Sequence, residues 1–319
     1  MLAAADPGRY DVVPVGIARD GRWVRAEPAP DRLTAEGPEV SPADVLGRAG
    51  TIAFPVLHGP FGEDGTAQGL LEMMGVPYVG TGVLGSALCM DKAMAKDAAA
   101  AHGLPQVRHL AFRDVDLEDD FDGAMHRVAA DLGLPVFVKP ANLGSSVGVT
   151  RAADVGELGT AVKLALGYDE WVVVEEAVVA REIECGVLGY GRLRASVPGE
   201  IRPSHVFYDY DDKYADGAAE LLVPAPLPPG VADEVCRLAV AAANALRVDG
   251  MARVDFFYEE GGRGLLLNEV NTIPGFTPIS MYPKMWAATG IPYRQLIDEL
   301  VDAALARHRN RAERYGRSR

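Results

Sequence analysis

The chain has 319 residues, of which 49% are hydrophobic and 24% charged, and this composition is typical of a globular protein with two or three domains. Its formal net charge of -14 argues against a nucleic-acid partner, because phosphate backbones are bound by basic surfaces. The 3 cysteines are widely separated, which supports neither a disulfide framework nor a zinc site and fits a reducing cytoplasm. No apolar run approaches the ~20 residues of a membrane-spanning helix, so we expect no membrane partner.

The first candidate ligand loop follows an apolar run at residues 52–57, which is typical of a buried parallel strand. A glycine-rich loop, residues 58–65, comes next and leads into an apolar-periodic helix over residues 67–74. Ligands of α/β proteins commonly bind at the carboxyl ends of parallel strands, so this loop is a candidate site. His58 taken alone is better explained as a loop histidine with ordinary hydrogen bonds.

Residues 80–85 match the pattern G-x-G-x-x-G, which occurs in dinucleotide-binding folds. Such a fold needs an acidic residue at the end of a second strand about 20 residues further on. The sequence has an alanine-rich helix there, at residues 96–102. We therefore interpret the glycines as a turn before a helix whose N-cap is near Thr81, and we expect no nicotinamide cofactor.

A candidate anion-binding loop lies between two short predicted strands, residues 134–140 and 146–150. Small residues with free backbone N–H groups occupy positions 141–145, directly after the strand that carries Lys139. Successive N–H groups of this kind can surround an anion, and Lys139 would add a fixed positive charge. An ordinary hairpin loop is the alternative interpretation.

Carboxylates flank an apolar connector between two further predicted strands, the first ending in Glu175 and Glu176 and the second starting at Glu182. Carboxylates accept hydrogen bonds from amines and ribose hydroxyls, so this arrangement suits a nucleoside whose ring the connector covers. Solvated charges at strand ends are the alternative.

The stretch over residues 203–220 is aromatic and charged and follows neither the helical nor the strand period. Loops of this length are usually lids or disordered segments, and the aromatic side chains favour a lid that docks on a surface.

The most informative stretch is a predicted β-hairpin formed by residues 251–258 and 265–275. Alternation places Arg253 and Asp255 on one face of the first strand. In the same way, Glu269 and Asn271 share one face of the second. Two carboxylates and an amide oxygen are ligands that Mg²⁺ takes beside phosphates, and the guanidinium adds positive charge. The hairpin therefore indicates phosphoryl chemistry, unless its polar face simply contacts water.

A basic run begins at Arg307 and continues to Arg319. Cations in the last turn of a helix interact favourably with the helix dipole. We interpret this run as the end of a helix followed by a frayed tail.

These segments, in this order, resemble the ATP-grasp superfamily and, more closely, its D-alanine:D-alanine ligases. The resemblance covers nearly the whole chain and rests on the motifs His58-Gly59, Gly62-Glu-Asp-Gly65, Met90-Asp-Lys92, Val138-Lys-Pro140, Gly144-Ser-Ser-Val-Gly148, Phe207-Tyr-Asp-Tyr-Asp-Asp-Lys-Tyr214, Arg253-Val-Asp255 and Asn268-Glu-Val-Asn-Thr-Ile-Pro-Gly275. It implies an α/β ATP-grasp fold, α+β in its ATP-binding part. An N-terminal parallel-sheet domain (1–91) would precede a small central domain (92–180) and a C-terminal domain (181–319), and ATP would lie between antiparallel sheets of the last two.

The resemblance also implies which residues bind ATP and metal. The ATP contacts would be Lys92, Lys139 and Lys213 at the phosphates, Glu175 on the adenine side, Glu182 at the ribose, and Ser146 and Asn268 elsewhere in the nucleotide site. The metal ligands would be Asp255, Glu269 and Asn271, holding two Mg²⁺ or Mn²⁺ ions.

The implied reaction joins two D-alanine molecules through an acyl phosphate, for peptidoglycan precursor synthesis in the cytoplasm by a homodimer. In this reaction, Arg253 and the Gly275 backbone N–H would stabilise developing negative charge. Ser145 and Tyr214 would orient the first D-alanine and close the lid, and His58 would lie beside that D-alanine. Ser280 and Met281 would bind the carboxylate of the second D-alanine.

One departure from the family pattern concerns the start of the chain. The family begins with a strand, a glycine-rich turn with a Ser-Glu-His type motif and a helix, and this sequence begins after all three. The absent Glu would join Ser145 and Tyr214 in a hydrogen-bonded trio, so we expect a sequence shortened at its N-terminus or a defective ligase. We favour the first, because losing a central strand would expose the apolar flank of residues 52–57.

Two other functions stay compatible with these motifs. One is another ATP-grasp carboxylate–amine ligase, because the lysines and the metal ligands indicate only acyl-phosphate chemistry. The other is a non-catalytic nucleotide-binding protein.

Overall fold

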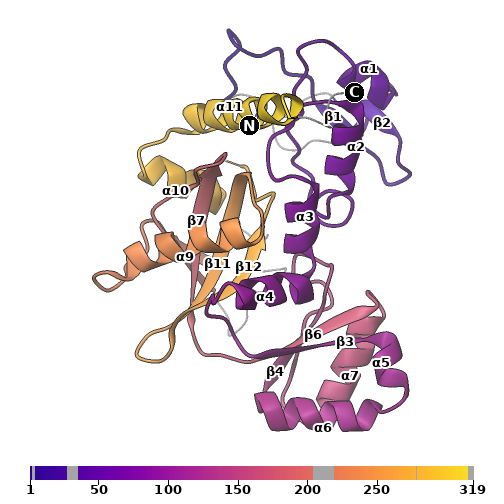
Figure 1. Cartoon of the computed structure of the whole chain (residues 1–319), viewed down its shortest axis with the longest axis vertical. Helices are drawn as coiled ribbons and strands as arrows, with labels where there is room; N and C mark the ends of the chain where they lie inside the picture. Colours follow the sequence, from indigo (N-terminus) through magenta and orange to yellow (C-terminus); the bar gives the residue numbers. More distant parts are fainter. Residues whose placement is uncertain (2–3, 27–34, 204–218, 278, 315–319) are drawn as a thin grey trace.

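The computed structural model describes residues 1, 4–26, 35–203, 219–277 and 279–314. Helices α1 to α3 lie at one end of an elongated molecule, a sheet covered by α9 occupies the middle, and a smaller sheet with α6 and α7 forms the other end (Figure 1). Of the helices in these ranges, none combines the length and the apolar character that crossing a membrane requires.

The N-terminal part contains a two-stranded antiparallel sheet and short helices. Its elements are β1 (Val15–Ile17), β2 (Trp23–Arg25), α1 (Pro42–Leu46), α2 (Thr66–Met74) and α3 (Val83–Met90). In place of the expected parallel sheet, the described residues of this part form one parallel bridge, between Ala53 and Tyr78. Pro55 accounts for the short pairing, because proline has no N–H to donate to a neighbouring strand. The predicted strand over residues 52–57 is therefore wrong in its extent.

The central sheet is antiparallel, with the strand order β3-β6-β4-β5. Its elements are β3 (His109–Arg113), α5 (Asp114–Glu118), α6 (Phe121–Leu132), β4 (Val136–Pro140), β5 (Thr150–Ala152), α7 (Val155–Leu166) and β6 (Trp171–Glu176). Buried and partly exposed residues alternate along β4, so Val136 and Val138 enter the core beneath α6 and α7. The same alternation turns Lys139 to the opposite face of the sheet.

The larger sheet has the strand order β10-β9-β7-β11-β12. β8 pairs with Val187 and Leu188 of β7, on the same edge as β9 and beyond the part that β9 reaches. Its elements are β7 (Arg181–Gly189), β8 (Arg194–Ala195), β9 (Gly199–Pro203), β10 (Ala219–Leu222), α9 (Val231–Ala245), β11 (Gly250–Glu259) and β12 (Gly264–Asn271). Helix α9 covers one face, because its residues Val235, Leu238 and Ala242 recur at helical spacing and join the core of this sheet. Val254 and Phe256 point into that core, so Asp255 between them lies on the other face.

Helix α4 (Lys92–Ala101) lies between the two sheets and packs on both. Ala93 contacts Ala141 and Val173 of the central part, whereas Ala99 belongs to the core beneath α9. The strands of the central sheet fall between residues 109 and 176, and those of the larger sheet between 181 and 271. Both sets lie within the predicted domains, whose boundaries at 91/92 and 180/181 stay predictions.

The chain closes with α10 (Met281–Ala288) and α11 (Tyr293–Ala312). Arg307 of α11 is 3% exposed and donates hydrogen bonds to the carbonyl oxygens of Gly80 and Tyr78, the latter at 2.8 Å. Its guanidinium also lies 4.3 Å from the centre of the Tyr78 ring. The basic run therefore begins with a buried residue that joins the last helix to the N-terminal part, which the interpretation as a helix end did not predict.

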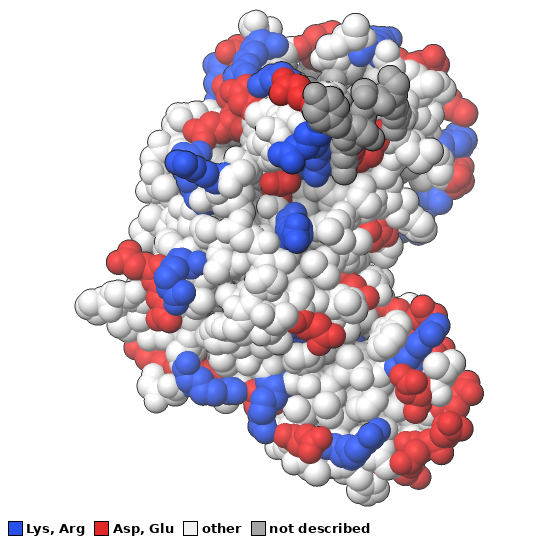
Figure 2. Space-filling view, in the orientation of Figure 1, with Lys and Arg blue, Asp and Glu red and all other residues white. Residues whose placement is uncertain are grey.

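Charged side chains of both signs are scattered over the largely uncharged face shown in Figure 2, and acidic ones gather at its lower right, over α5 and the start of α6. These two elements begin with an acidic first turn that includes Asp114, Asp116 and Asp122. A surface of this sign repels phosphate backbones, in agreement with the net charge of the chain.

Candidate active site

The predicted hairpin of β11 and β12 is present, and its register brings the candidate metal ligands together. Asp255 lies directly opposite Glu269, and Arg253 lies opposite Asn271. Directly paired residues of antiparallel strands have Cβ atoms about 5 Å apart, so these side chains share one small area. A bulge follows Asp255 and shifts the register, which confines the polar row to this end of the hairpin.

Arg253 is held by two carboxylates. Its Nε and Nη2 atoms donate to Asp255 at 2.8 and 2.7 Å, and its Nε lies 3.0 Å from Oε1 of Glu184 on the neighbouring strand β7. Burial alone would lower the pKa of the Arg253 guanidinium, but Asp255 and Glu184 outweigh it and raise that pKa further. The guanidinium is therefore a fixed positive charge in a fixed orientation.

The donor set of the hairpin fits a magnesium-type ion. Across the described ranges, no three His, Cys, Asp or Glu side chains lie close enough together to hold a metal ion. The three candidate ligands here are two carboxylates and the amide of Asn271, a residue type outside that set. The Oδ1 atom of Asn271 accepts a hydrogen bond from the Ile273 N–H at 3.1 Å and has a second lone pair. Each Asp255 oxygen bound by Arg253 likewise has more than one lone pair. Few protein oxygens suffice for Mg²⁺, because phosphate and water oxygens complete its shell.

A buried ion cluster stands beside the hairpin. The Nζ atom of Lys139 lies 2.7 Å from Oε2 of Glu175, and the Nζ atom of Lys96 lies 3.0 Å from its Oε1. Burial would raise the pKa of the Glu175 carboxyl, but the two ammonium groups outweigh it and lower that pKa to about 2. Glu175 is therefore ionised, and it was predicted as an adenine contact without these lysine partners.

The predicted anion-binding loop follows β4 and adopts an unusual backbone. Ser145 and Ser146 have φ angles of 54° and 59°, a left-handed conformation that is uncommon for residues other than glycine. Lys92 Nζ donates to the Leu143 carbonyl at 2.5 Å, which ties this loop to the start of α4. Strain of this kind concentrates at binding sites, so the conformation supports the loop as a candidate ligand contact.

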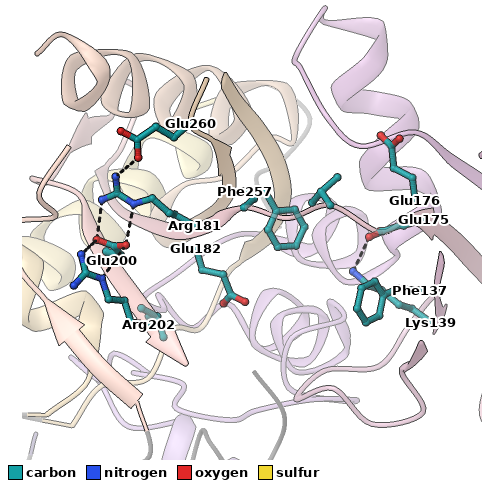
Figure 3. Close-up of a pocket in the computed structure, with 13 residues that line it drawn as sticks. Phe137, Lys139, Glu175, Glu176, Arg181, Glu182, Glu200, Arg202, Phe257 and Glu260 are labelled. Atoms are coloured by element: carbon teal, nitrogen blue, oxygen red, sulfur yellow. Dashed lines mark hydrogen bonds and ion pairs between the residues drawn. The ribbon is translucent and has the colours of Figure 1, made fainter. Parts of the chain in front are cut away.

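A cavity of about 480 Å³ separates the two sheets (Figure 3). Lys139 and Glu175 lie at one end, and Glu182 points into the space beside Phe257. The other end is closed by an ion network in which Arg181 binds Glu200 and Glu260. The size suits a small-molecule site, and carboxylates with one aromatic face suit a nucleoside. Glu182 thus lies where a ribose contact was expected, although its role stays a prediction.

The N-terminal loop reaches the electrostatic surroundings of the hairpin. His58 keeps an exposed edge, and partial burial and then the charge of Arg253 lower the pKa of its imidazole. Burial raises the pKa of the Glu63 carboxyl to about 7, and the negative charge of Glu269 raises it as well. The hydrogen bond that the Gly59 N–H donates to Glu63 at 2.5 Å acts in the opposite direction and lowers this pKa. The structure therefore adds Glu63 to the candidate site.

The segment after β12 brings two further candidates together. A Cβ atom on Gly275 would come within 2.9 Å of Ser280 Oγ, so the two residues are neighbours and Gly275 has no room for a side chain. Ser280 precedes α10, and its Oγ accepts from the Thr277 N–H at 3.1 Å. The side chain of Met281 is buried with Met285, which leaves its backbone for any substrate contact.

Asn268 has an orphaned acceptor. Its Oδ1 atom is buried and has no hydrogen-bond partner within the part of the chain that the structure describes. Such an atom fits a residue that gains a partner when a ligand binds. Lys213 and Tyr214, with the predicted lid over residues 207–214, lie outside the described residues.

Sequence reasoning missed Glu184 and Lys96 as well as Glu63. Glu184 stands two residues after Glu182 on one strand, and Lys96 stands four residues after Lys92 on one helix. These spacings place each on the same face as a predicted site residue, and they were the available signal.

Comparisons with known proteins identify the family of the chain. Residues 99–302 match the family described as "D-ala D-ala ligase C-terminus", and residues 1–81 match "D-ala D-ala ligase N-terminus". The D-alanine–D-alanine ligase of Caldicellulosiruptor bescii is 44% identical over 98% of this chain and 90% of its own length. That of Mycobacterium sp. (strain KMS) is 47% identical over 96% and 91%.

Solved structures give the same result. The VanG D-Ala:D-Ser ligase of Enterococcus faecalis has a TM-score of 0.80 and 32% identity, over 95% of this chain and 92% of its own. The D-alanine–D-alanine ligase of Coxiella burnetii has a TM-score of 0.78 and 33% identity, over 97% and 89%. The chain therefore belongs to the D-alanine–D-alanine ligase family and has its α/β ATP-grasp fold.

Proposed function

We propose that this chain uses ATP to join two D-alanine molecules into D-alanyl-D-alanine, a step of peptidoglycan precursor synthesis. The observation that carries the proposal is the 44% identity to a ligase of this name over 98% of the chain. The site geometry supports it, because a carboxylate pair and a fixed arginine share one end of the hairpin, while Lys139 and Glu175 line the cavity that Phe257 of the same hairpin also lines.

The nucleotide and the metal are assigned to two adjacent regions. We propose that ATP occupies the cavity between the sheets, with its phosphates towards Lys92 and Lys139 and towards Ser146. Asp255, Glu269 and Asn271 would hold Mg²⁺ or Mn²⁺, as two ions. The bound ions would neutralise the charge of the reacting phosphates.

In the proposed first step, the carboxylate of one D-alanine attacks the γ-phosphorus of ATP and ADP leaves. This kind of step is accelerated by positioning the reactants and by neutralising the charge of the phosphates. The ammonium group of Lys139 contributes because it is held in a fixed position where it can neutralise that charge. The product is an acyl phosphate, which water would hydrolyse. The segment over residues 207–214, with Lys213 and Tyr214, is assigned to cover it.

In the proposed second step, the amine of another D-alanine attacks the acyl carbon, and phosphate leaves the tetrahedral intermediate. Arg253 already has its orientation fixed by Asp255 and Glu184, so it can stabilise the oxyanion without reorganising. The Gly275 N–H is the second assigned donor. Ser145 and His58 are assigned to the first D-alanine, and the Ser280-Met281 backbone to the carboxylate of the second.

The acceptor is proposed to be D-alanine and not D-lactate. In the resemblance to the family, Tyr214 corresponds to a tyrosine of the dipeptide ligases. A closed hydrogen-bond network that includes its hydroxyl would discriminate, because an unpaired buried polar group costs about 1 to 3 kcal/mol. D-serine is a specific competitor to test, since the VanG structure is named as a D-Ala:D-Ser ligase.

The decisive experiment incubates the purified chain with ATP, Mg²⁺ and D-alanine, alone and with D-lactate or D-serine added. We expect ADP release that depends on D-alanine, with D-alanyl-D-alanine as the main product by mass spectrometry. ADP release without any dipeptide would favour another carboxylate–amine ligase, and nucleotide binding without turnover would favour a binding protein.

A homodimer in the cytoplasm completes the proposal. Helices α2 and α3 pack together and expose the apolar side chains of Leu70, Met73 and Leu84, which are 39%, 74% and 64% exposed. Contiguous exposed apolar residues commonly mark an interface with another protein chain.

A further inference from the structure

One carboxylate is shared by two buried lysines beside the cavity. The side chains of Lys96 and Glu175 are 4% and 3% exposed, and that of Lys139 is 13% exposed. The residues that line the cavity include Lys139 and Glu175 but not Lys96, as Figure 3 also shows for the first two. Among the described residues, Lys96 reaches the cavity lining through its ion pair with Glu175.

The fold holds Lys96 in this place from several sides. Asp91 caps α4 by accepting from the Met94 N–H at 3.0 Å, and the buried face of the helix carries Ala93, Lys96 and Ala99. The Lys96 carbonyl accepts from Gln106 Nε2 at 2.9 Å. Burying the charged ammonium group of a lysine costs free energy of folding, because desolvation disfavours the charge. A lysine held in the interior by both its backbone and its ammonium group therefore calls for an explanation.

Charge balance suggests what Lys96 contributes. Glu175 alone would neutralise Lys139, which would leave little net attraction for an anion. With two ammonium groups on one carboxylate, the buried cluster keeps one net positive charge, and Lys139 lies on its cavity side. Attraction of this kind is strong where water is excluded.

We infer that Lys96 is a positioning residue, which anchors Glu175 and offsets its negative charge so that Lys139 stays available to the phosphates of ATP. This inference rests on the proposed role of Lys139 as a phosphate contact. Lys96 itself touches no reacting atom.

The test compares Lys96→Met with the double variant Lys96→Met/Glu175→Gln in the full chain, by calorimetry with ADP and by steady-state kinetics. Lys96→Met should weaken ADP binding by about tenfold and raise the KM for ATP similarly, because a charge-assisted contact is worth about that factor. The KM for D-alanine should not change. The double variant should bind ADP more tightly than Lys96→Met and within about threefold of Glu175→Gln alone, because without the carboxylate Lys139 is no longer neutralised. Lys163→Met, on the far helix α7, is the matched control and should change nothing.

Several results would overturn the inference. Unchanged ADP affinity in folded Lys96→Met would do so, and so would equally weak binding in the single and the double variant, which would indicate a packing role. If Lys96→Met does not fold, the double variant is compared with Glu175→Gln alone: equal ADP affinity supports the inference, and a further loss of about tenfold contradicts it. Lys139→Met tests the proposed phosphate contact separately from the role of Lys96. An ADP affinity unchanged by Lys139→Met would reject the proposed phosphate site itself.

Discussion

Asp255 and Glu269 face each other across the hairpin, yet they differ in what else they hold. Asp255 is bound by two nitrogens of Arg253, whereas Glu269 lies opposite it on β12. Loss of either should remove a ligand of the proposed metal site. Loss of Asp255 should also leave a buried arginine with one carboxylate fewer.

We expect Asp255→Asn and Glu269→Gln each to lower turnover at least about a hundredfold, because uncompensated phosphate charge opposes the reaction. Asp255→Asn should also cost about 2 kcal/mol of unfolding free energy, and Glu269→Gln much less. A coupled ADP assay and urea unfolding measure the two effects. Near-normal turnover in either folded variant would remove that residue from the metal site.

The Glu63 carboxyl predicts a pH dependence of stability. Its pKa rises from 4.5 to about 7 on folding, so the folded chain holds this proton more tightly than the unfolded chain. The stability that it contributes is therefore complete below about pH 4.5 and is lost as the pH rises through about 7.

Across this range the wild type should lose about 3 kcal/mol relative to Glu63→Gln, which carries no titrating group at this position. Urea unfolding of both proteins at several pH values measures the difference. Parallel stability curves would show that Glu63 titrates normally.

Single residues of the site were predictable where one strand or loop determines them. Arg253 and Asp255 follow from alternation along a strand, which needs no knowledge of the rest of the fold. The partners of Lys96 and Glu184 depend on how α4 and β7 lie against other elements, and spacing alone does not specify that. Glu63 was quoted in a motif, but only its burial makes it unusual.

At the scale of elements, α11 shows how a polar sequence can conceal a buried contact. Arg307 occupies the same helical end as the exposed Arg309, and composition does not distinguish them. The distinction comes from Tyr78 and Gly80, whose carbonyl oxygens lie more than 200 positions earlier in the chain.

We expect Arg307→Met to cost about 3 kcal/mol of unfolding free energy, because two buried carbonyl groups would lose their donor. Arg309→Met, on the exposed side of the same turn, should cost less than about 0.5 kcal/mol. Chemical denaturation compares them directly. Equal stabilities would mean that water replaces the guanidinium without loss.

The other elements were predictable to differing degrees. The hairpin of β11 and β12 follows from its alternation and turn, and β4 with its lysine follows from an apolar run. The predicted strand over residues 146–150 is instead a loop, and β5 covers Thr150–Ala152. Ser145 and Ser146 explain the shift, since left-handed residues cannot continue a strand.

At the scale of the whole molecule, the fold class and the two facing sheets were predicted through the order of the motifs, and the reduced N-terminal pairing was not. Four of the exposed large apolar side chains of that part lie on α2 and α3, namely Leu70, Met73, Val83 and Leu84. The assembly of two chains is the property that this surface should control.

We expect Met73→Glu combined with Leu84→Glu to convert the proposed dimer into a monomer, because two charges would be buried at its interface. Light scattering across a concentration series measures the mass. Leu164→Glu on α7, where the residue is 49% exposed, is the matched control and should leave the dimer intact. A mass unchanged by the double substitution would place the interface elsewhere.

The position of α4 limits how the chain could be divided or permuted. The segment after it pairs with β12 through the bridge between Gln106 and Leu267, and the Pro105 carbonyl accepts from the Leu267 N–H at 2.7 Å. New termini placed between α4 and β3 would disrupt the segment that joins the helix to the edge of β12. Circular permutants should therefore tolerate a break in the turn after β7, around Gly191, and not between residues 102 and 108.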